Sequence, residues 1–455
     1  HLFVNFGTSF QKLFCLLKQN LFQHIIDTQH YSHSPDKRPY ALKLPVLFMT
    51  ATFNLSLLNL LEKMIDIMIL PSNFFWCNRS WMMKRCIDMQ IYCSMQYTRI
   101  VKKYIMSTLE KNHDKKVIIY SNTAVSIESM KVMLETWIDH STELKCDIVG
   151  ITGDLEPELK LAYTELFTQA PITEENVTDL TFNPRILLAT ASCIGAGLDS
   201  SDVFTVIRVG FPSSLLDLVQ EMGRCGRGRV DDGMNPSDEF ILIFNLYDYM
   251  YMLERIYSKE INDESTNKKE ERFCNKVISE KDKKKQQQED LLDLLKVLTS
   301  FETCYHYKIE NVGANPMLSE ERFNSSDACG NACPICKKQL SNFMLPIKKE
   351  GVQNFLIHTF ISSPPTTGIT AKDMLTRLKT YEDVGKVVYG RPHSNKPPDA
   401  KYLHWTILQL IPSSMAIIKI SEDDSKGIFQ LGMQTNSPYP IYLLYDVWKY
   451  FKCIE

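Results

Sequence analysis

The stretch QEMGRCGRG, residues 220–228, places two arginines three positions apart among three glycines. On a helical turn Arg224 and Arg227 would share one face, and the glycines would keep bulk away from it. A pair of forked guanidinium groups suits a carboxylate or, better, a phosphate. Because Glu221 is the one acidic neighbour, the stretch predicts a site for a phosphate that comes from elsewhere.

A glycine-interrupted loop follows an apolar run in RILLATASCIGAGLDSSDV, residues 185–203. The run ends at Thr190, and the loop carries Gly195, Gly197 and Asp199. Open α/β sheets bind ligands at such loops, at the carboxyl ends of parallel strands. Taken alone, Gly-Ala-Gly also fits a tight turn, but the arginines downstream favour a ligand site.

Four cysteines supply a second and independent signal. Cys329, Cys333 and Cys336 stand in CGNACPIC, and Cys304 precedes them. Four thiolates at short spacings suit a closed tetrahedral site for Zn²⁺. The alternative is a coincidence of cysteines in a loop of small residues.

The elements that must position these residues follow from apolar runs that alternate with helical patterns between residues 115 and 249. Buried β-branched strands that alternate with helices predict a parallel sheet in an α/β domain. The expected strands are 117–121, 146–153, 185–190, 203–210 and 239–244, and one expected helix runs through 130–139.

Composition changes abruptly over 254–290, which is charged, rich in Gln and almost without aromatic residues. We expect a flexible or loosely helical insertion there, with lysines that are solvated or that touch nucleic acid. A helix is expected over 291–304. Helices at 370–380 and 400–411, followed by two strands within 415–433, predict a winged-helix domain in which His404 and Trp405 have core roles.

The chain has 455 residues, a charge of −3, 44% hydrophobic and 23% charged residues. This length exceeds one core and fits roughly three or four domains. The charge excludes a uniformly basic nucleic-acid coat, so a nucleic-acid site must be a local patch. We expect no membrane span, because the most apolar run contains Glu62, Lys63 and Asp66. The thirteen cysteines, mostly scattered, suit a reducing compartment.

The ordered stretches VIIYSNT, GITGDL, ILLATASCIGAGLD and QEMGRCGRG resemble motifs IV, IVa, V and VI of superfamily-two helicases, above all the RecQ family. The resemblance implies two RecA-like domains that sandwich ATP and Mg²⁺. It implies that Arg227 is the arginine finger and that Arg224 and Gln220 act beside it. Gly195, Gly197 and Asp199 would line the nucleotide side, while Thr190, Ser121 and Asn122 would contact DNA.

The first residues extend the resemblance. HLFVNFGTSFQKLF resembles the RecQ segment that begins with the His of the D-E-x-H box, with Phe6 and Phe10 in its DNA-contacting aromatic loop. Phe6 stands where Trp is usual and Gln11 where Arg is usual, and a core-packing role for these aromatics is the alternative. MTAT at 49–52 resembles motif III.

A G-x-x-x-x-G-K-[ST] phosphate loop is missing, and the acidic pair of D-E-x-H would lie before His1. We therefore expect a fragment that starts inside the first motor domain and that hydrolyses no ATP by itself. The expected domains are part of a first RecA-like domain (1–74), a second (75–253), a linker (254–290), a zinc-binding subdomain (291–345) and a winged-helix domain (346–455).

The distant Cys followed by a tight trio also resembles the RecQ zinc subdomain. Its loop from Cys304 to Cys329 is longer than usual, and Tyr305-His306 replaces a common Arg pair, so DNA contacts are not expected there.

The resemblance implies an ATP-dependent 3′-to-5′ DNA helicase of RecQ type. It would act on single-stranded and forked DNA in repair, recombination or replication. A nuclear location is expected from the long charged insertion. One alternative is a non-catalytic DNA-binding or regulatory protein derived from such a helicase. Another is an RNA helicase, which shares motifs IV to VI but would not explain the cysteines.

Overall fold

The structure is a computed structural model. It describes residues 87–110, 115–141, 146–168, 184–191, 193–194, 198, 200, 202–226, 238–258, 280–300, 304–313, 329, 332–337, 369–380, 400–412, 417–420 and 427–430. The predicted first motor domain, with Phe6 and Phe10, lies outside the described residues.

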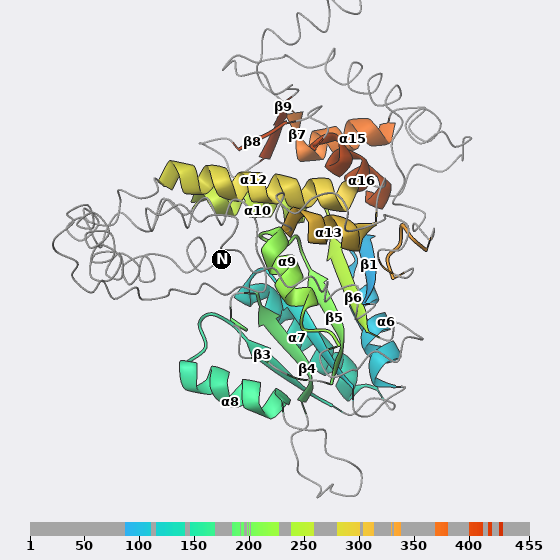
Figure 1. Cartoon of the computed structure of the whole chain (residues 1–455), viewed down its shortest axis with the longest axis vertical. Helices are drawn as coiled ribbons and strands as arrows, with labels where there is room; N and C mark the ends of the chain where they lie inside the picture. Colours follow the sequence, from blue (N-terminus) through green and yellow to red (C-terminus); the bar gives the residue numbers. More distant parts are fainter. Residues whose placement is uncertain are drawn as a thin grey trace, which may run out of the picture.

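A parallel sheet of six strands forms the centre of the molecule (Figure 1). Its order is β1-β6-β5-β2-β4-β3, and every neighbouring pair is parallel. The strands are β1 (Asp88–Cys93), β2 (Lys116–Ser121), β3 (Asp147–Ile151), β4 (Pro184–Thr190), β5 (Val203–Val209) and β6 (Glu239–Phe244). The five predicted strands are confirmed.

Strand β1 was not predicted, because its sequence has no continuous apolar run. It pairs with β6 alone. Its sequence DMQIYC alternates polar and apolar residues, and burial alternates with it. The central strands β2, β4 and β5 are buried at every position, so they form the continuous apolar runs that a sequence search detects.

Helices cover both faces of the sheet. Helices α6 (Tyr97–Leu109) and α7 (Ala124–Asp139) pack with Val117, Ile119 and Ile207 in one core cluster. The opposite face, with Ile118 and Val206, packs against α9 (Leu215–Met222) and α10 (Leu246–Ser258). Helix α8 (Pro157–Thr168) follows β3. Burial on both faces stabilises the sheet and fixes where each strand ends.

The charged stretch that was predicted as a linker is helical at both ends. Helix α10 runs to Ser258, and α12 runs from Glu280 to Thr299. Lys, Glu and Gln are strong helix formers, and Lys285 and Glu289 form an i,i+4 pair at 3.9 Å. The second half of α12 buries Leu291, Leu294, Leu295 and Leu298 in the core cluster shared with α9 and α10. The predicted helix over 291–304 therefore begins earlier, at Glu280 within the charged stretch, and packs through its leucines.

Beyond α12 lie α13 (Tyr305–Gly313), α15 (Ala371–Thr380) and α16 (Ala400–Leu410), with an antiparallel sheet in the order β7-β9-β8. Its strands are β7 (Ile369–Thr370), β8 (Ile417–Ile420) and β9 (Gly427–Gln430). The predicted helices and strand pair are present here, while their assignment to a winged helix stays a prediction.

Helix α16 packs on the six-stranded parallel sheet through its aromatic residues. Trp405 is fully buried, with its ring centroid 6.2 Å from that of Phe244. His404 is 3% exposed and stands edge-on to Tyr247 at 5.2 Å. Burial lowers the pKa of His404 to about 4. The predicted core roles of His404 and Trp405 are confirmed.

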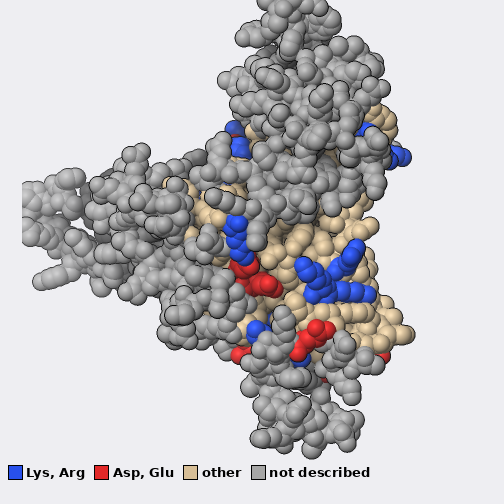
Figure 2. All heavy atoms as spheres, turned by 90° about the vertical axis from the view of Figure 1, so that its right-hand side faces the viewer, with Lys and Arg blue, Asp and Glu red and all other residues tan. Residues whose placement is uncertain are grey.

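The surface carries local charge despite the small net charge. On the side shown in Figure 2, Lys and Arg side chains gather in one patch beside a few acidic ones. Helix α6, on that side in Figure 1, exposes Arg99 and Lys103. Among the helices that the structure describes, none combines the length and apolar character needed to cross a membrane.

Candidate functional site

The carboxyl edge of the parallel sheet gathers several of the predicted site residues. Ser121 ends β2 and Thr190 ends β4, and the two are register partners on neighbouring strands. Both are buried, with exposed fractions of 4% and 7%. Thr190 Oγ1 donates to Cys193 Sγ at 2.8 Å. The fold thus brings together two residues that stand almost seventy positions apart in the chain.

A small pocket opens beside this edge, between β2, the loop after β4 and helix α9. It is lined by Tyr120, Ala191, Ile194, Asp217, Gln220, Glu221 and Arg224. The Ser214 side chain accepts from the Asp217 backbone N–H and so caps the start of α9. Gln220 and Arg224 therefore lie at one pocket with Ala191, which follows the end of β4, and their roles stay a prediction.

The arginine motif differs locally from the prediction. Helix α9 ends at Met222, so Arg224 lies in the turn after the helix. Arg224 is 7% exposed, and its Nη1 donates to the Leu198 carbonyl at 2.7 Å. Arg227 lies outside the described residues, as do Gly195, Gly197 and Asp199. Helix α9 stops before Arg224, and a shared face of Arg224 and Arg227 stays a prediction.

Gly226 explains part of that turn. Its φ is +65°, in the left-handed region that favours glycine. A Cβ at this position would meet Asp238 Oδ2 at 2.3 Å. One glycine of the motif therefore permits close approach, and the group that approaches is a carboxylate of the same chain.

Sequence reasoning missed Arg208, which connects the parts of this site. It lies on β5 with 1% of its surface exposed. Its Nη1 donates to Glu221 Oε1 at 2.8 Å, and its Nη2 donates to Asn122 Oδ1. It also donates to the backbone carbonyls of Gly210 and Phe211, at 3.3 and 3.2 Å. Arg208 thereby ties the ends of β2 and β5 to α9.

The contacts with Arg208 affect the pKa of Glu221 and the hydrogen bonding of the Asn122 amide. Burial raises the pKa of Glu221 to about 7, while Arg208 acts in the opposite direction. The Asn122 side chain accepts from Arg208 and donates to the Phe211 carbonyl at 3.1 Å, so both ends of its amide are engaged. Glu221 therefore partners Arg208. The one available signal was a lone Arg in the apolar run VFTVIRVG, since a buried charge needs a partner.

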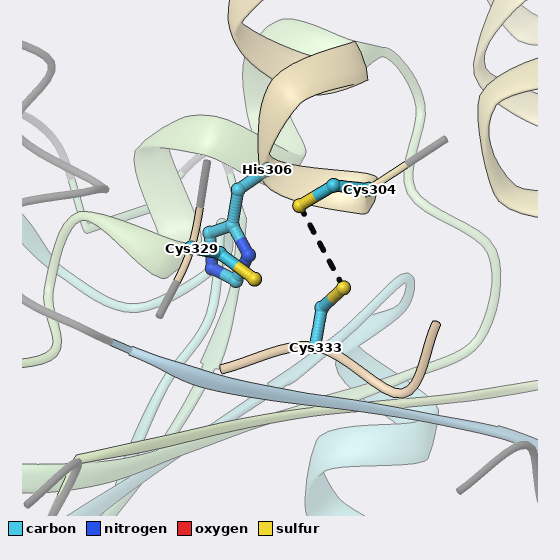
Figure 3. Close-up of side chains that lie close together, drawn as sticks. All are labelled: Cys304, His306, Cys329 and Cys333. Carbon is cyan, nitrogen blue, oxygen red and sulfur yellow. Dashed lines mark hydrogen bonds between the residues drawn. The ribbon is translucent and has the colours of Figure 1, made fainter. Parts of the chain in front are cut away.

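A sulfur-rich cluster lies at the start of α13, against the parallel sheet. Cys304, His306, Cys329 and Cys333 have ligand atoms that all lie within 4.8 Å of one another, and all four residues are buried (Figure 3). Three of the four predicted cysteines therefore come together. Cys336 is half-buried; its backbone N–H donates to Cys333 Sγ at 3.5 Å, and its side chain hydrogen-bonds with Cys329 and Cys333.

The geometry and electrostatics of the cluster fit a metal ion. The sulfurs of Cys304 and Cys333 lie 3.7 Å apart, far longer than a disulfide. Tetrahedral ligands at a Zn–S distance of about 2.3 Å lie about 3.8 Å from one another. Hydrogen bonding with the Cys304 and Cys329 side chains lowers the pKa of Cys333, whereas hydrogen bonding with Cys304 and Cys333 raises that of Cys329.

The cluster is built into the fold. Ala332 accepts at its carbonyl from the Met89 backbone N–H on β1 at 2.8 Å, and Lys337 pairs with Asp88 at 2.5 Å. The segment 332–337 therefore lies against the edge strand β1.

Part of the parallel α/β domain matches a known protein family. Residues 98–229 match the family described as helicase conserved C-terminal domain. The ATP-dependent RNA helicase MRH4, mitochondrial, of Scheffersomyces stipitis is 31% identical over 130 residues, which cover 28% of this chain and 20% of that protein. Its namesake from Debaryomyces hansenii is 30% identical over 121 residues, 26% and 19% of the two chains. This chain thus spans about a fifth of the length of these two relatives.

Solved structures give weaker likenesses. Domain 2 of the DEAD-box helicase Mss116p, bound to an RNA duplex, aligns with a TM-score of 0.28 and 18% identity, over 54% of this chain and 84% of that one. The Mycobacterium smegmatis helicase Lhr, bound to single-stranded DNA and AMP-PNP, aligns with a TM-score of 0.26 and 17% identity, over 38% and 21%.

The comparisons correct two predictions. The nuclear location is contradicted, because the three matching relatives are all named mitochondrial proteins. All three are also named RNA helicases, whereas the sequence resemblance implied a RecQ DNA helicase. The expectation of a helicase-type domain is supported by the match of residues 98–229 to a helicase C-terminal domain family and by the parallel α/β sheet.

Proposed function

We propose that this chain supplies the C-terminal motor lobe of an ATP-dependent helicase that acts on RNA. The observation that carries the proposal is the convergence of Ser121, Thr190, Gln220 and Arg224 at one edge of a sheet whose residues match a helicase domain. In parallel α/β sheets this edge is where ligands bind.

In this proposal each residue has a distinct task. ATP with Mg²⁺ supplies the free energy, and Arg227 is the finger that stabilises charge on the transferred phosphoryl group. Arg224 stands beside it, held by the Leu198 carbonyl. Gly195, Gly197 and Asp199 line the nucleotide side, and Gln220 is exposed at the pocket.

On the nucleic-acid side, Ser121 and Thr190 end neighbouring strands and contact the sugar-phosphate backbone. Asn122 is the next residue after β2 and is bonded to Arg208, which is bonded to Glu221 on α9. A displacement of the segment at the end of β2, which contains Ser121 and Asn122, is therefore transmitted to α9, the helix that precedes the arginines. Arg208 acts here as a positioning residue.

RNA is the favoured substrate because the matching relatives are named ATP-dependent RNA helicases. The same names support a mitochondrial location for this protein. Fractionation of source cells, with the protein followed by immunoblotting, tests it: recovery outside mitochondria contradicts the location.

A second candidate is a 3′-to-5′ DNA helicase of RecQ type, acting on single strands and forks. The buried cluster of Cys304, Cys329 and Cys333 against the motor sheet favours it, since an RNA helicase resemblance does not account for these cysteines. A non-catalytic nucleic-acid-binding protein is the remaining alternative.

The test uses the full open reading frame. ATP hydrolysis is measured with single-stranded RNA and with DNA of the same sequence, each as a salt series because phosphate contacts depend on salt. We expect stimulation by RNA that Arg227→Ala and Arg224→Ala abolish. Stimulation by DNA alone would support the second candidate, and binding without any hydrolysis would support the non-catalytic protein.

The backbone contact has a separate readout. Thr190→Val removes one hydroxyl at nearly constant shape and should weaken RNA binding in fluorescence anisotropy. Thr136→Val is the matched control, because the Thr136 hydroxyl is exposed on α7 and bonds only to its own helix at Val132. Equal affinities of the two variants would remove Thr190 from the interface.

A further inference from the structure

We propose that the chain segments after β1 and β6 form a stacking surface for single-stranded RNA, made of Tyr97, Tyr247 and Tyr251 together with Arg255. These four residues are called the tyrosine surface below. It rests on the proposed function, because it extends the same nucleic-acid edge and specifies that the bases of the strand are held there.

The three tyrosines differ from the other aromatic residues in their exposure. Among the Phe, Tyr and Trp side chains that the structure describes, the exposed ones are Tyr97, Tyr247 and Tyr251, each exposing 37–40% of its surface. The remaining described rings of these types are buried or half-buried. Met95, close to Tyr97 in the chain, is also exposed. Three large rings therefore remain accessible to a ligand with flat apolar faces.

The parallel sheet brings the two segments to one place, its carboxyl edge. The last residues of β1 and β6, Cys93 and Phe244, are register partners on neighbouring strands. The Ser94 backbone N–H donates to the Phe244 carbonyl at 3.0 Å, so the two segments leave the sheet side by side. Tyr97 is the first residue of α6, and Tyr247 lies in the first turn of α10. Rings from distant parts of the sequence therefore start from one edge.

Helix α10 continues the surface toward the predicted nucleic-acid contacts. Tyr247, Tyr251 and Arg255 follow one another at intervals of four positions, so they lie along one helix face at steps of about 6 Å. Arg255 Nη1 donates to the Asn122 carbonyl at 3.4 Å, immediately after the end of β2. Figure 1 shows α10 beside α12, above the parallel sheet. The tyrosine surface therefore extends from the end of β6 to the end of β2.

The chemistry of the surface suits an unpaired strand. Bases stack on aromatic side chains with little regard to sequence, and arginine adds attraction to the phosphates. Arg255 is exposed, and Arg99 adds another exposed cation in the first turn of α6. The acidic residues of α10, Asp248 and Glu254, are partly buried, and Asp248 Oδ2 accepts from a backbone N–H of its own turn. Charge and exposed rings together favour an anionic ligand with accessible bases.

The test is fluorescence anisotropy of the protein from the full open reading frame, without ATP. The probes are labelled oligouridine and an abasic RNA strand of the same length. Tyr247→Ala combined with Tyr251→Ala should weaken oligouridine binding by about 5-fold or more for each ring, because base stacking is lost. Binding of the abasic strand should not change, since its phosphates still find Arg255.

Matched variants separate stacking from other effects. Tyr247→Phe combined with Tyr251→Phe keeps both rings and should bind oligouridine as wild type does. Leu161→Ala is the control for loss of an exposed apolar side chain, because α8 follows β3 at the opposite edge of the sheet. Arg255→Gln should lower the slope of log affinity against log salt by about 0.7, the value for one phosphate of a single strand.

Crosslinking tests the wild-type chain without any substitution. RNA that carries 5-iodouridine should crosslink to Tyr97, Tyr247 or Tyr251 under near-ultraviolet light, as mapped by mass spectrometry of peptides. Crosslinks that all map to other segments would count against the tyrosine surface.

Equal oligouridine affinities of wild type and the double alanine variant would overturn the proposal. An equal loss for the abasic strand would also overturn it, because stacking requires bases, and so would a wild type that binds oligothymidine but not oligouridine. ATP hydrolysis by the same samples keeps the two proposals apart. RNA-stimulated hydrolysis with unaltered RNA binding in the double alanine variant contradicts the tyrosine surface alone, whereas base-dependent binding without hydrolysis contradicts the proposed function alone.

Discussion

Replacing Arg208 by Met is the sharpest test of how the motor lobe is held together. Methionine retains much of the aliphatic length of the side chain but no donor. The change leaves Glu221 buried without its partner, and it removes the donors to Asn122 Oδ1 and to the carbonyls of Gly210 and Phe211. We expect a large loss of stability at a site with no predicted catalytic role.

The magnitude follows from burial of both partners. Arg208 and Glu221 side chains are 1% and 4% exposed and lie 2.8 Å apart. Removing one partner of such a pair costs about 3–5 kcal/mol, because the remaining charge is buried alone. Arg208→Met combined with Glu221→Leu should recover part of this loss, since the double variant leaves no orphan carboxylate.

The pH dependence gives an independent check. The folded-state pKa of Glu221, about 7, is above its ordinary value of 4.5, so its proton-linked stabilisation is fully present below about 4.5 and is lost as pH rises through about 7. Because Arg208 lowers this pKa, Arg208→Met raises it further, and Glu221 stays protonated to higher pH. The destabilisation should therefore be smaller at pH 6 than at pH 8.

Urea unfolding of the full chain, resolved by hydrogen exchange of peptides from β2, β5 and α9, measures these differences. Arg99→Met on exposed α6 is the matched control and should change stability by less than about 0.5 kcal/mol. A loss below about 1 kcal/mol for Arg208→Met at pH 8, or a double variant no more stable than the single one, would refute the reasoning.

Three further outcomes follow from single residues. Gly226→Ala should destabilise by about 1–3 kcal/mol in the same assay, because φ is +65° and the new Cβ meets Asp238 Oδ2 at 2.3 Å. Gly150→Ala, whose Cβ would have ordinary contacts, should be neutral or stabilising, and equal effects would contradict this account. The folded-state pKa of His404 is lowered from 6.5 to about 4, because burial favours the neutral ring. The folded state is therefore stabilised above pH 6.5, and this stabilisation is lost as pH falls toward 4. Wild type should therefore lose about 3 kcal/mol relative to His404→Phe across that window in urea titrations, and parallel pH profiles would count against it. Trp405→Ala should lower the free energy of unfolding by about 3–5 kcal/mol and expose β6 to hydrogen exchange. A smaller loss with unchanged exchange would contradict the packing of α16 against the core.

Part of this protein could be predicted from residues close together in the chain. The central strands β2, β4 and β5 were predictable because a strand buried on both faces must be apolar at successive positions. The motif residues at the ends of β2 and β4 were predictable because parallel strands end at one edge. The cysteine spacing indicated a metal site, since zinc knuckles use short spacings.

Other features arise from contacts between distant segments, which no local pattern encodes. Edge strand β1 alternates like a surface strand, and only its pairing with β6 identifies it. Arg208 donates a hydrogen bond to Asn122, eighty-six positions away in the chain. The partner of such a buried charge depends on which strand ends the sheet brings together. His306 was visible as a residue, but its meeting with Cys333 depends on α13 folding back over the sheet. The sequence by itself determined the sheet and its motifs, whereas the tertiary structure decided which charges and ligands meet, because burial penalises every polar group that finds no partner.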